Sequence, residues 1–373
     1  MRILVIDTGS SSVKFSVYDI PAGTECFASE IERATSIEDA LALVPAALVK
    51  ADMQSFDAVG HRVAHGGERF VQATKIDDAV IAGIEACSSL APLHNPPALA
   101  GIAMTRKAWG NLPQVVVFDT AFHHAMPARA ITYAVPEAWR QASVRRYGFH
   151  GPSHQYIMER VADELGTAAT QLRIVSCHLG NGASVCAIDR GQSVDTSMGL
   201  TALEGLVMGT RSGDIDPGLF GYLNRTLGLS IADIEAALYR KSGLAGLSGI
   251  GNDVRDIEAQ AAQGNKDAAL ALDVFCYRIR KYIGAYAAAM GGLDVLAFTG
   301  GIGEHSANVR SRVCTGFEYL GLLFDEEHNA KVKLSGFEAP QLQQVASRVK
   351  VLVTQTREQW MIARQTYALL KKE

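Results

Sequence analysis

Two segments of the chain share one pattern of apolar and polar positions. Each starts with an apolar run rich in β-branched residues, passes through a turn of glycine, serine or asparagine, and continues in a second apolar run. The segments are residues 2–19 (RILVIDTGSSSVKFSVYD) and 173–189 (RIVSCHLGNGASVCAID). This pattern predicts a β-hairpin with a tight loop in each place. The repetition predicts two similar halves arranged around a phosphate.

The loops of both predicted hairpins suit an anion. Small-residue loops turn backbone N–H groups and hydroxyls toward a phosphate, and glycine lets the backbone approach it closely. Lys14, just past the first turn, adds a point charge. Because each loop joins two strands, it differs from a P-loop, which leads into a helix. We therefore expect phosphate binding at a hairpin loop.

The remaining pattern mixes helices with strands. In the first half we expect a helix over residues 36–50, strands over 56–63 and 114–119, and a helix from residue 151, which follows a turn that includes His150. In the second half we expect a glycine-rich stretch over residues 195–221 and helices over 230–241, 253–263 and 266–290. A strand over 294–299, a glycine turn over 300–303 and an amphipathic terminal helix over 357–370 follow. An α/β protein is therefore predicted.

Length and composition narrow the class of protein. With 373 residues, of which 48% are hydrophobic and 20% charged, the chain is long enough for two domains with buried cores. A net charge of −4 and scattered basic residues argue against nucleic acid as a partner. Six cysteines without regular spacing indicate reduced thiols. We expect a cytoplasmic protein without a membrane partner, because the pattern contains neither a secretory leader nor an apolar run of membrane-spanning length.

Two arginines lie in turns where phosphoryl transfer could use them. Catalysis of that reaction rests on cationic groups that position and neutralise the transferring phosphoryl group. Arg62 is flanked by small apolar residues and followed by a turn, and Arg211 lies in a glycine-rich loop. Two alternatives stay open. Arg62 can be a buried structural arginine, and Arg211 can pair with Asp214 to stabilise its loop.

A carboxylate and two histidines are further candidates. Asp119 closes a strand pattern, where a carboxylate of an α/β protein often faces the ligand crevice or else caps a helix. His150 and His178 each adjoin a glycine at a turn, where an imidazole can donate to a phosphoryl oxygen or serve the structure alone. In the absence of a zinc-binding pattern we interpret them as hydrogen-bond donors. The other histidines of the first half are placed in loops or supporting positions: His61, His65, His123 and His124.

Two turns of the second half could contact a nucleotide. The Gly300–Gly303 turn lies between a strand and a helix, but it lacks the spacing of a dinucleotide-binding loop, so the signal by itself is weak. Asp253 opens a helix after a glycine turn, where an N-cap role is equally plausible.

Nine segments, in order, make the chain resemble the acetate and propionate kinase family of short-chain carboxylate kinases. The resemblance runs over nearly the whole chain. The segments are residues 7–15 (DTGSSSVKF), 60–68 (GHRVAHGGE), 93–96 (LHNP), 118–123 (FDTAFH), 145–154 (RRYGFHGPSH), 178–185 (HLGNGASV), 195–216 (DTSMGLTALEGLVMGTRSGDID), 248–257 (SGIGNDVRDI) and 298–306 (FTGGIGEHS).

The resemblance implies a fold and a division of the chain. The family belongs to the actin, hexokinase and Hsp70 ATPase superfamily. Two duplicated ribonuclease H-like (actin-like ATPase) domains are therefore expected, with a nucleotide cleft between them. The expected domains are residues 1–150 and 151–373, with the terminal helix able to pack back on the N-terminal domain.

The resemblance also implies roles for individual residues. Arg62 and Arg211 would hold the carboxylate and the γ-phosphoryl group, His150 would stabilise the transition state with Arg211, and Asp119 would be the acid/base or positioning carboxylate. The implied acyl pocket consists of Ala64, Leu93, Phe149 and Ala202, with Arg62 beside it. The implied nucleotide contacts are Lys14, His178, Leu179, Gly180, Asn181, Gly182, Asp253, Val254, Arg255, Gly301, Ile302, Gly303, Glu304 and His305.

The chain departs from the family pattern in its metal-binding segments. Asp7 replaces the usual asparagine and restores a carboxylate that related ATPases carry, so Mg²⁺ (or Mn²⁺) binding is expected there. Of the paired glutamates near the C-terminus only Glu358 remains, followed by Gln359, and it is the second expected metal ligand.

The chain also departs from the family pattern in its acyl pocket. Ala202 stands where proline is usual, and Ala64 where valine is frequent. Both changes remove volume. Such a change is worth only about 1–3 kcal/mol in acyl discrimination, so acceptance of propionate beside acetate is our hypothesis.

The resemblance finally implies an activity, with ATP and ADP as co-substrates. The expected reaction is ATP-dependent phosphorylation of acetate to acetyl phosphate, which is reversible, by a homodimer. A propionate kinase or a broad short-chain carboxylate kinase is the first alternative. An ATP-driven chaperone or filament protein of the same fold, and a non-catalytic nucleotide-binding regulator, are the more distant ones.

Overall fold

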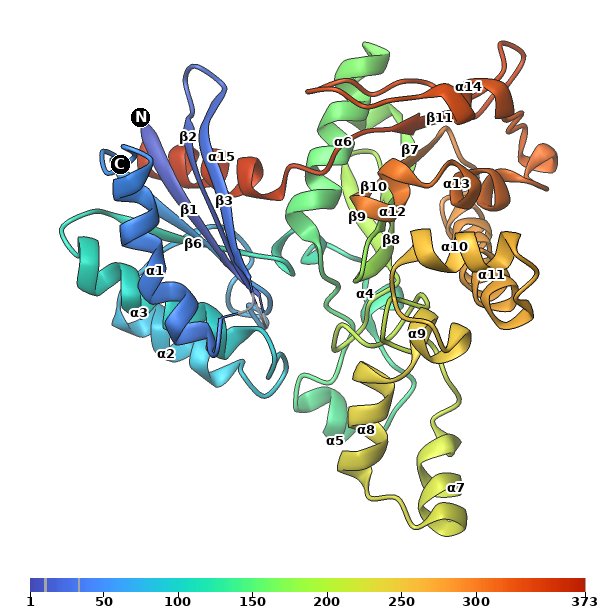
Figure 1. The fold of residues 1–373 in the computed structure, drawn as a ribbon, viewed down its shortest axis with the longest axis horizontal. Helices are drawn as coiled ribbons and strands as arrows, with labels where there is room; N and C mark the ends of the chain where they lie inside the picture. The colour runs from blue at the N-terminus through green and yellow to red at the C-terminus, as the bar shows by residue number, and fades with distance from the viewer. Residues whose placement is uncertain (10–11, 33, 373) are drawn as a thin grey trace. The chain divides into compact units, whose positions relative to one another are not determined.

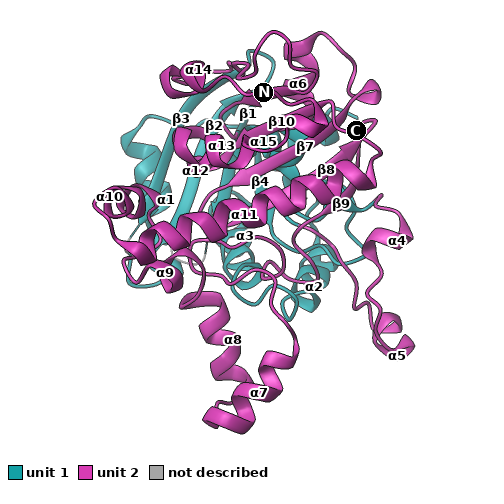
Figure 2. Cartoon of the chain, turned by 90° about the vertical axis from the view of Figure 1, so that its right-hand side faces the viewer, with its two compact units in different colours: residues 1–124, 149–156, 357–373 teal, residues 125–148, 157–356 magenta. Residues whose placement is uncertain are grey.

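The structure is a computed structural model that describes residues 1–9, 12–32 and 34–372 (Figure 1). Its contacts divide the chain into two compact units (Figure 2). Unit 1 comprises residues 1–124, 149–156 and 357–373, and unit 2 comprises residues 125–148 and 157–356. Each unit contains one β-sheet with helices, so the predicted α/β class is confirmed. The division at residue 150 stays a prediction.

The sheet of unit 1 has the strand order β3-β2-β1-β4-β6-β5. The first three strands form an antiparallel meander, and β1, β4 and β6 run parallel to one another. The strands are β1 (Arg2–Thr8), β2 (Ser12–Asp19), β3 (Thr24–Glu32), β4 (Ala58–Val63), β5 (Thr74–Lys75) and β6 (Gln114–Phe118).

The sheet of unit 2 repeats this topology. Its order is β9-β8-β7-β10-β11, with an antiparallel meander from β7 to β9 and parallel pairing of β7, β10 and β11. In both meanders the register shifts between the second and third strands. The strands are β7 (Arg173–Leu179), β8 (Ala183–Asp189), β9 (Gln192–Thr196), β10 (Val295–Thr299) and β11 (Lys350–Val353). The two hairpins predicted from the repeated pattern are therefore β1–β2 and β7–β8.

Helices cover the sheets. Unit 1 has α1 (Ile37–Lys50), α2 (Asp78–Ala86), α3 (Asn95–Trp109), the 3₁₀ turn η1 (Ala121–His123), the start of α6 (Gly151–Leu165) and α15 (Glu358–Leu370). Unit 2 has α4 (Ala128–Ile131), α5 (Glu137–Gln141), η2 (Ala169–Gln171), α7 (Gly218–Leu227), α8 (Ile231–Arg240), α9 (Gly243–Ser248), α10 (Val254–Ala262), α11 (Lys266–Ala289), α12 (Gly300–His305), α13 (Ala307–Cys314), η3 (Glu318–Leu320) and α14 (Glu326–Lys331). No helix in the described part of the chain has the length and apolarity to cross a membrane.

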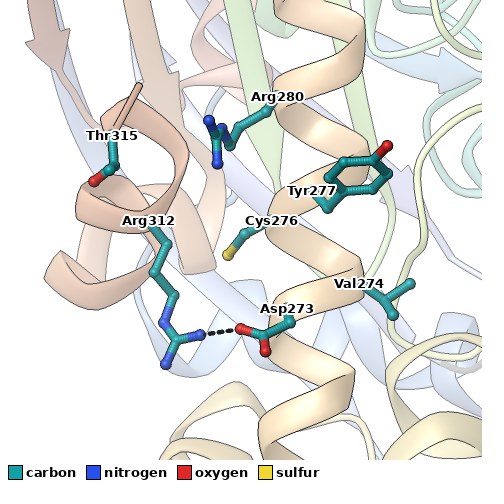
Figure 3. A pocket seen from close by; sticks show the side chains of 7 residues that line it. All are labelled: Asp273, Val274, Cys276, Tyr277, Arg280, Arg312 and Thr315. Carbon is teal, nitrogen blue, oxygen red and sulfur yellow. Dashed lines mark hydrogen bonds and ion pairs between the residues drawn. The ribbon is translucent and has the colours of Figure 1, made fainter. Parts of the chain in front are cut away.

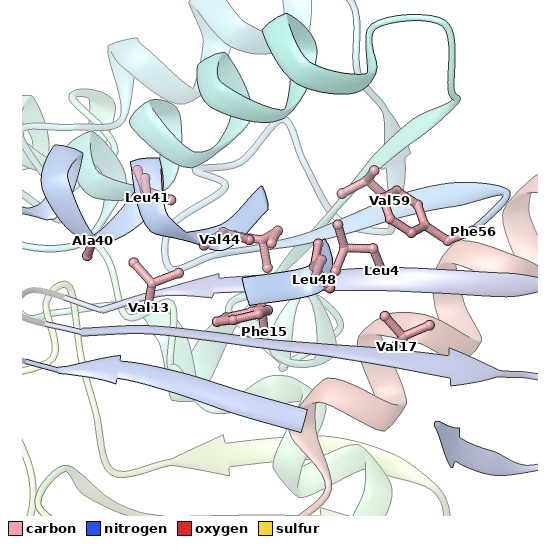
Figure 4. Close-up of a cluster of buried hydrophobic side chains, with 11 residues drawn as sticks. Leu4, Val13, Phe15, Val17, Ala40, Leu41, Val44, Leu48, Phe56 and Val59 are labelled. Carbon is pink, nitrogen blue, oxygen red and sulfur yellow. The ribbon is translucent and has the colours of Figure 1, made fainter. Parts of the chain in front are cut away.

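The sheet of unit 1 is buried on both faces. Leu4 and Ile6 of β1 point to one face, where they share a core with α1 residues such as Leu41 and Leu48 (Figure 4). Ile3 and Val5, which alternate with them, pack on the other face against Ile362 and Ala363 of α15. The fully apolar pattern of β1 follows from this double coverage.

Gly60 of β4 lets α15 lie close to the sheet. A Cβ atom at this position would lie 2.6 Å from Thr366 Oγ1 and 3.0 Å from Ile362 Cγ2. No side chain larger than hydrogen fits there unless the Thr366 or Ile362 side chain shifts. The close packing fixes α15, and with it the position of Glu358 in the first turn of that helix.

Packing of α15 predicts a stability difference between two isoleucines. Ile362 is fully buried, so Ile362→Ala should lower the free energy of unfolding by about 2–5 kcal/mol. Ile231 on α8 is 69% exposed, and Ile231→Ala should change the free energy of unfolding by less than about 0.5 kcal/mol. Chemical denaturation followed by circular dichroism measures both. Equal losses would contradict the packing described for α15.

Candidate functional site

Two parallel strands of unit 1 deliver opposite charges to the same face of the sheet. In β1, alternation places Asp7 on the face of Val5, which packs against α15. In β4, Arg62 shares that face with Ala58. Because β1 and β4 pair in parallel, their C-terminal ends meet at one edge of the sheet. Asp7 and Arg62 are therefore brought together by strand register.

A third strand and the last helix complete this cluster. Asp119 directly follows β6, which pairs in parallel with β4, and it lies two positions after Val117 on the α15 face. Glu358 is the first residue of α15. We call Asp7, Arg62, Asp119 and Glu358 the Arg62 cluster.

Arg62 is held mainly by Asp119. Its Nε and Nη2 donate to the two carboxylate oxygens of Asp119 at 2.8 and 2.7 Å, a bidentate fork. Its Nη1 makes longer contacts of 3.3 and 3.4 Å to Asp7, and Nη2 lies 4.0 Å from Glu358 Oε1. Asp119 orients the guanidinium, and the Nη1 side is the less firmly occupied one.

Three carboxylates face one guanidinium in this cluster. Burial, together with the charges of Asp119 and Asp7, raises the pKa of Glu358 to about 7, although Arg62 opposes the shift. Glu358 Oε1 is buried and has no hydrogen-bond partner among the described residues. The cluster thus has a surplus of negative charge and an acceptor that nothing in the described chain satisfies.

Carboxylate oxygens are the ligands that Mg²⁺ prefers, usually one or two of them together with substrate phosphates. Asp7 and Glu358 fit that demand, because one contacts Arg62 only loosely and the other leaves an oxygen unsatisfied. Among the described residues no group of three or more His, Cys, Asp or Glu side chains could hold a metal ion by itself.

Lys14 lies opposite Asp7 in the β1–β2 register. Its side chain is exposed, its Nζ lies 3.9 Å from Glu30 Oε1, and its charge acts on the carboxyl group of Glu358. The register thus places this predicted nucleotide contact beside the Arg62 cluster. The neighbouring Ser10 and Ser11 lie outside the described residues.

His150 has a left-handed backbone, with φ of 59°, which is uncommon for a residue other than glycine. Gly151 holds this conformation in place because its N–H donates to the Asp119 carbonyl at 2.9 Å, and a Cβ on Gly151 would collide with that oxygen. His123 adds a second tie, since its Nε2 lies 2.9 Å from the Phe149 carbonyl oxygen. Burial lowers the pKa of His123 to about 4, so the ring is neutral and donates from Nε2.

Three acyl-pocket candidates of unit 1 are joined through their neighbours. Asn95, next to the Leu93 turn, accepts from the His65 N–H at 3.1 Å and donates to the His65 carbonyl at 3.0 Å. The His65 ring, which follows Ala64, meets Phe149 edge-on at 5.6 Å between centroids. The segments that carry Ala64, Leu93 and Phe149 therefore lie together.

The hairpin loop of unit 2 lies against the loop that carries Arg211. His178 is the last residue but one of β7 and is buried. The loop closes by a hydrogen bond from the Gly180 N–H to the Gly182 carbonyl at 3.1 Å. Asn181 accepts from the Gly209 N–H on its carbonyl at 2.9 Å and from Asn252 Nδ2 on its side chain at 2.8 Å.

Arg211 contacts another predicted residue of unit 2. Its Nη1 donates to the Ala202 carbonyl at 3.0 Å. Asp214, the partner considered for Arg211 as an alternative, makes contacts of its own: it lies 3.9 Å from Arg278, and its carboxylate accepts from the Tyr282 hydroxyl and the Gly205 N–H.

The two turns predicted for the nucleotide are both well defined. Asp253 caps α10, because its carboxylate accepts from the Arg255 N–H at 2.9 Å. The same carboxylate forms an ion pair with the Arg255 guanidinium. Gly300 begins α12 with φ of 76°, and a Cβ there would lie 2.7 Å from the Leu179 carbonyl oxygen. Only glycine lets this turn approach the end of β7. Gly301 is exposed, and Glu304 Oε1 accepts from the Gly300 N–H at 3.0 Å.

The structure thus gathers the predicted residues into one set in each unit. The sequence pattern did not assign a role to Gly151 or Asn95, and it gave His123 only a loop or supporting position. All three lie inside motifs of the family, and a glycine or a polar residue in a buried segment is the signal that could have found the first two.

A cavity of about 510 Å³ in unit 2 contains none of the predicted site residues. It lies between α11 and α13, where Asp273 and Arg312 form an ion pair (Figure 3).

Comparison with known proteins identifies the family of the chain. A model of the acetokinase family matches residues 29–364. The chain belongs to the acetokinase family. Acetate kinases of Heliobacterium modesticaldum and Coprothermobacter proteolyticus are 44% and 45% identical to this family member, over all of this chain and 100% and 99% of theirs.

Solved structures of the acetokinase type share its fold. The acetate kinase of Porphyromonas gingivalis has a TM-score of 0.91 and 40% identity, with 99% of each chain covered. A propionate kinase from Francisella tularensis has a TM-score of 0.91 and 36% identity, with 98% of this chain and 99% of that one covered.

The raised pKa of Glu358 predicts a pH dependence of stability in this acetokinase. The folded protein holds the Glu358 proton up to about pH 7 and the unfolded chain only to about 4.5, so stability falls as pH rises between these values. Without divalent cations, wild type should lose about 2–3 kcal/mol of unfolding free energy relative to Glu358→Gln from pH 5 to pH 8.

Denaturant titrations at both pH values measure this difference. Glu235→Gln, at an exposed position of α8, is the matched control and should follow the wild type. Parallel pH profiles for wild type and Glu358→Gln would show that Glu358 is ionised throughout.

Proposed function

We propose that the protein transfers the γ-phosphoryl group of ATP to acetate, which gives acetyl phosphate and ADP, and that it catalyses the reverse reaction. The Arg62 cluster carries this proposal, because a guanidinium aimed by one carboxylate at the ends of parallel strands suits a small carboxylate substrate. Acetate kinases at 42–45% identity over at least 99% of this chain support acetate as the acceptor.

A substrate carboxylate can use the Nη1 side of Arg62. Asp119 occupies Nε and Nη2, while the contacts from Nη1 to Asp7 are long enough to be exchanged. An acetate oxygen then forms the new bond to phosphorus, and the bond to the β–γ bridging oxygen of ATP breaks. Because acetate is already ionised, no general base is needed, and Asp119 serves as the residue that orients Arg62.

We propose that Arg211 and His150 bind the phosphoryl oxygens in the transition state. A loose, planar phosphoryl group spreads its charge over three oxygens, which guanidinium and imidazole donors can neutralise. The hydrogen bonds made by Gly151 and Phe149, on either side of His150, support this role. They hold the backbone of His150 in place, and a pre-organised donor needs no reorganisation during transfer. Its left-handed φ is a strained conformation of the kind that clusters at active sites.

The nucleotide is proposed to bind the hairpin loop at His178–Gly182, the start of α10 at Asp253–Arg255, and the Gly301–His305 turn, with Lys14 near its phosphates. Gly300 lies close to Leu179, and Gly209 donates to Asn181, so the loops that carry these residues lie next to the hairpin loop. This proximity supports a single nucleotide-binding region in unit 2. Asp7 and Glu358 would hold Mg²⁺. The bound ion would neutralise phosphate charge.

The acyl pocket is proposed to consist of Ala64, Leu93, Phe149 and Ala202, with acetate preferred over propionate. The propionate kinase alternative is the weaker one, because the relatives at 42–45% identity are acetate kinases. We also propose a homodimer in the cytoplasm, which the family resemblance implies.

Loss of either arginine should abolish phosphoryl transfer. Arg62→Ala and Arg211→Ala should each lower kcat/KM for acetate by about 10³-fold or more, because each removes a cation from the transferring group. Trapping of acetyl phosphate as the hydroxamate measures the rate. Arg190→Ala, at an 80% exposed side chain, should retain wild-type activity. Wild-type protein that binds ATP yet forms no acyl phosphate would contradict the proposed function.

Asp7→Asn tests the proposed metal site by restoring the residue usual in the family. Loss of one ligand charge should raise the Mg²⁺ concentration for half-maximal activity by about tenfold, with a smaller change in kcat. The same assay with varied Mg²⁺ measures both quantities. Asp57→Asn, in the loop before β4, is the control and should leave the Mg²⁺ dependence unchanged. An unchanged Mg²⁺ dependence in Asp7→Asn would place the ion elsewhere.

A further inference from the structure

We propose that Tyr133, Arg146 and Glu204 form a clamp that positions Ala202 and Arg211, and that this clamp sets the selectivity for the acyl chain. The inference rests on the proposed function, since it concerns the same acyl pocket. These three side chains are positioning residues; none is proposed to contact substrate.

The segment that needs positioning is irregular but buried. Residues 197–217 contain no helix or strand, yet Ser197, Met198, Leu206 and Met208 are completely buried. Buried backbone groups outside regular structure must find other partners. The clamp supplies several of these partners.

Arg146 binds the start of this segment. Its Nη1 donates to the carbonyl oxygens of Thr196, Ser197 and Met198 at 2.9, 3.1 and 3.0 Å. Its Nη2 pairs with the carboxylate of Glu204. The Arg146 guanidinium therefore joins three successive peptide groups to the side chain of Glu204. The compact ammonium group of a lysine lacks the fork of donors that makes all of these contacts at once.

Tyr133 binds the same carboxylate and the backbone between these points. Its hydroxyl donates to Glu204 and accepts from the Leu200 N–H at 2.9 Å. Burial and the charge of Glu204 raise the pKa of Tyr133, so the hydroxyl stays protonated and remains a donor. Gly199 lies next to both the Glu204 carboxylate and the Tyr133 hydroxyl. The position requires glycine, because a Cβ atom there would collide with both groups.

Ala202 lies between the two clamped positions, Leu200 and Glu204. Arg211 contacts it directly, since its Nη1 donates to the Ala202 carbonyl. Alanine lacks the ring by which proline fixes φ, so the placement of this residue depends on its neighbours. A looser clamp would let Ala202 and Arg211 move together, which would change both the room for the acyl chain and the hold on the phosphoryl group.

Tyr133→Phe tests the clamp with the smallest change, since the ring stays and only the hydroxyl is lost. Loss of its two hydrogen bonds should raise KM for acetate about tenfold and change the acetate-to-propionate ratio of kcat/KM at least about threefold, while KM for ATP stays within about twofold. Tyr319→Phe, at a residue that is 72% exposed, is the matched control and should change none of these values.

Hydrogen exchange of residues 199–204, followed by mass spectrometry, gives a second readout that needs no activity. Exchange there should accelerate about tenfold in Tyr133→Phe, with β7 and β10 unchanged. Arg146→Lys should show the same pattern more strongly. Unchanged exchange, or faster exchange with unchanged acyl selectivity, would overturn the proposal. Inactive wild type would contradict the proposed function instead, and the exchange data would still decide whether the clamp exists.

Discussion

The contact between Arg62 and Asp119 is the interaction on which the site of unit 1 depends. Its fork fixes the guanidinium at the end of β4 and leaves Nη1 weakly held by Asp7. The fork exists only if β4 and β6 keep their register, because a slip of one residue would turn Arg62 to the opposite face. Glu358 reaches the same place only because α15 packs closely over Gly60. Sheet register and helix packing therefore determine the chemistry of the site together.

The repeated sheet topology places different chemistry at equivalent positions. In unit 1 the β1–β2 register pairs Asp7 with Lys14, whereas in unit 2 the β7–β8 register pairs His178 with Ser184. The first pair is charged and lies by a cluster rich in carboxylates. The second consists of a histidine and a serine and lies beside two glycine turns. The two units therefore share the same hairpin but differ in its residues. The β1–β2 hairpin carries charged side chains, and the β7–β8 hairpin allows close approach of neighbouring backbone.

The sequence alone predicted the elements with the strongest patterns. Both hairpins, the helix from Gly151 and the terminal helix follow from apolar periodicity and turn residues. It did not predict β3 or β9, whose half-exposed residues at the sheet edges give weak patterns. It also could not predict the partnership of Tyr133, Arg146 and Glu204. Their contacts join residues 58 and 71 positions apart, and only the folded chain brings such residues together.

A crystal structure with Mg²⁺, ADP, aluminium fluoride and acetate would test the proposed role of Arg62, because the fluoride mimics a planar phosphoryl group. We expect acetate to lie on the Nη1 side of Arg62, with Asp119 still forked to Nε and Nη2. We also expect Arg211 and His150 to contact the fluorides and Asp7 and Glu358 to face the magnesium ion. Acetate and fluoride bound away from Arg62, with its contacts to Asp7 and Asp119 unchanged, would show that Arg62 does not bind the substrate carboxylate.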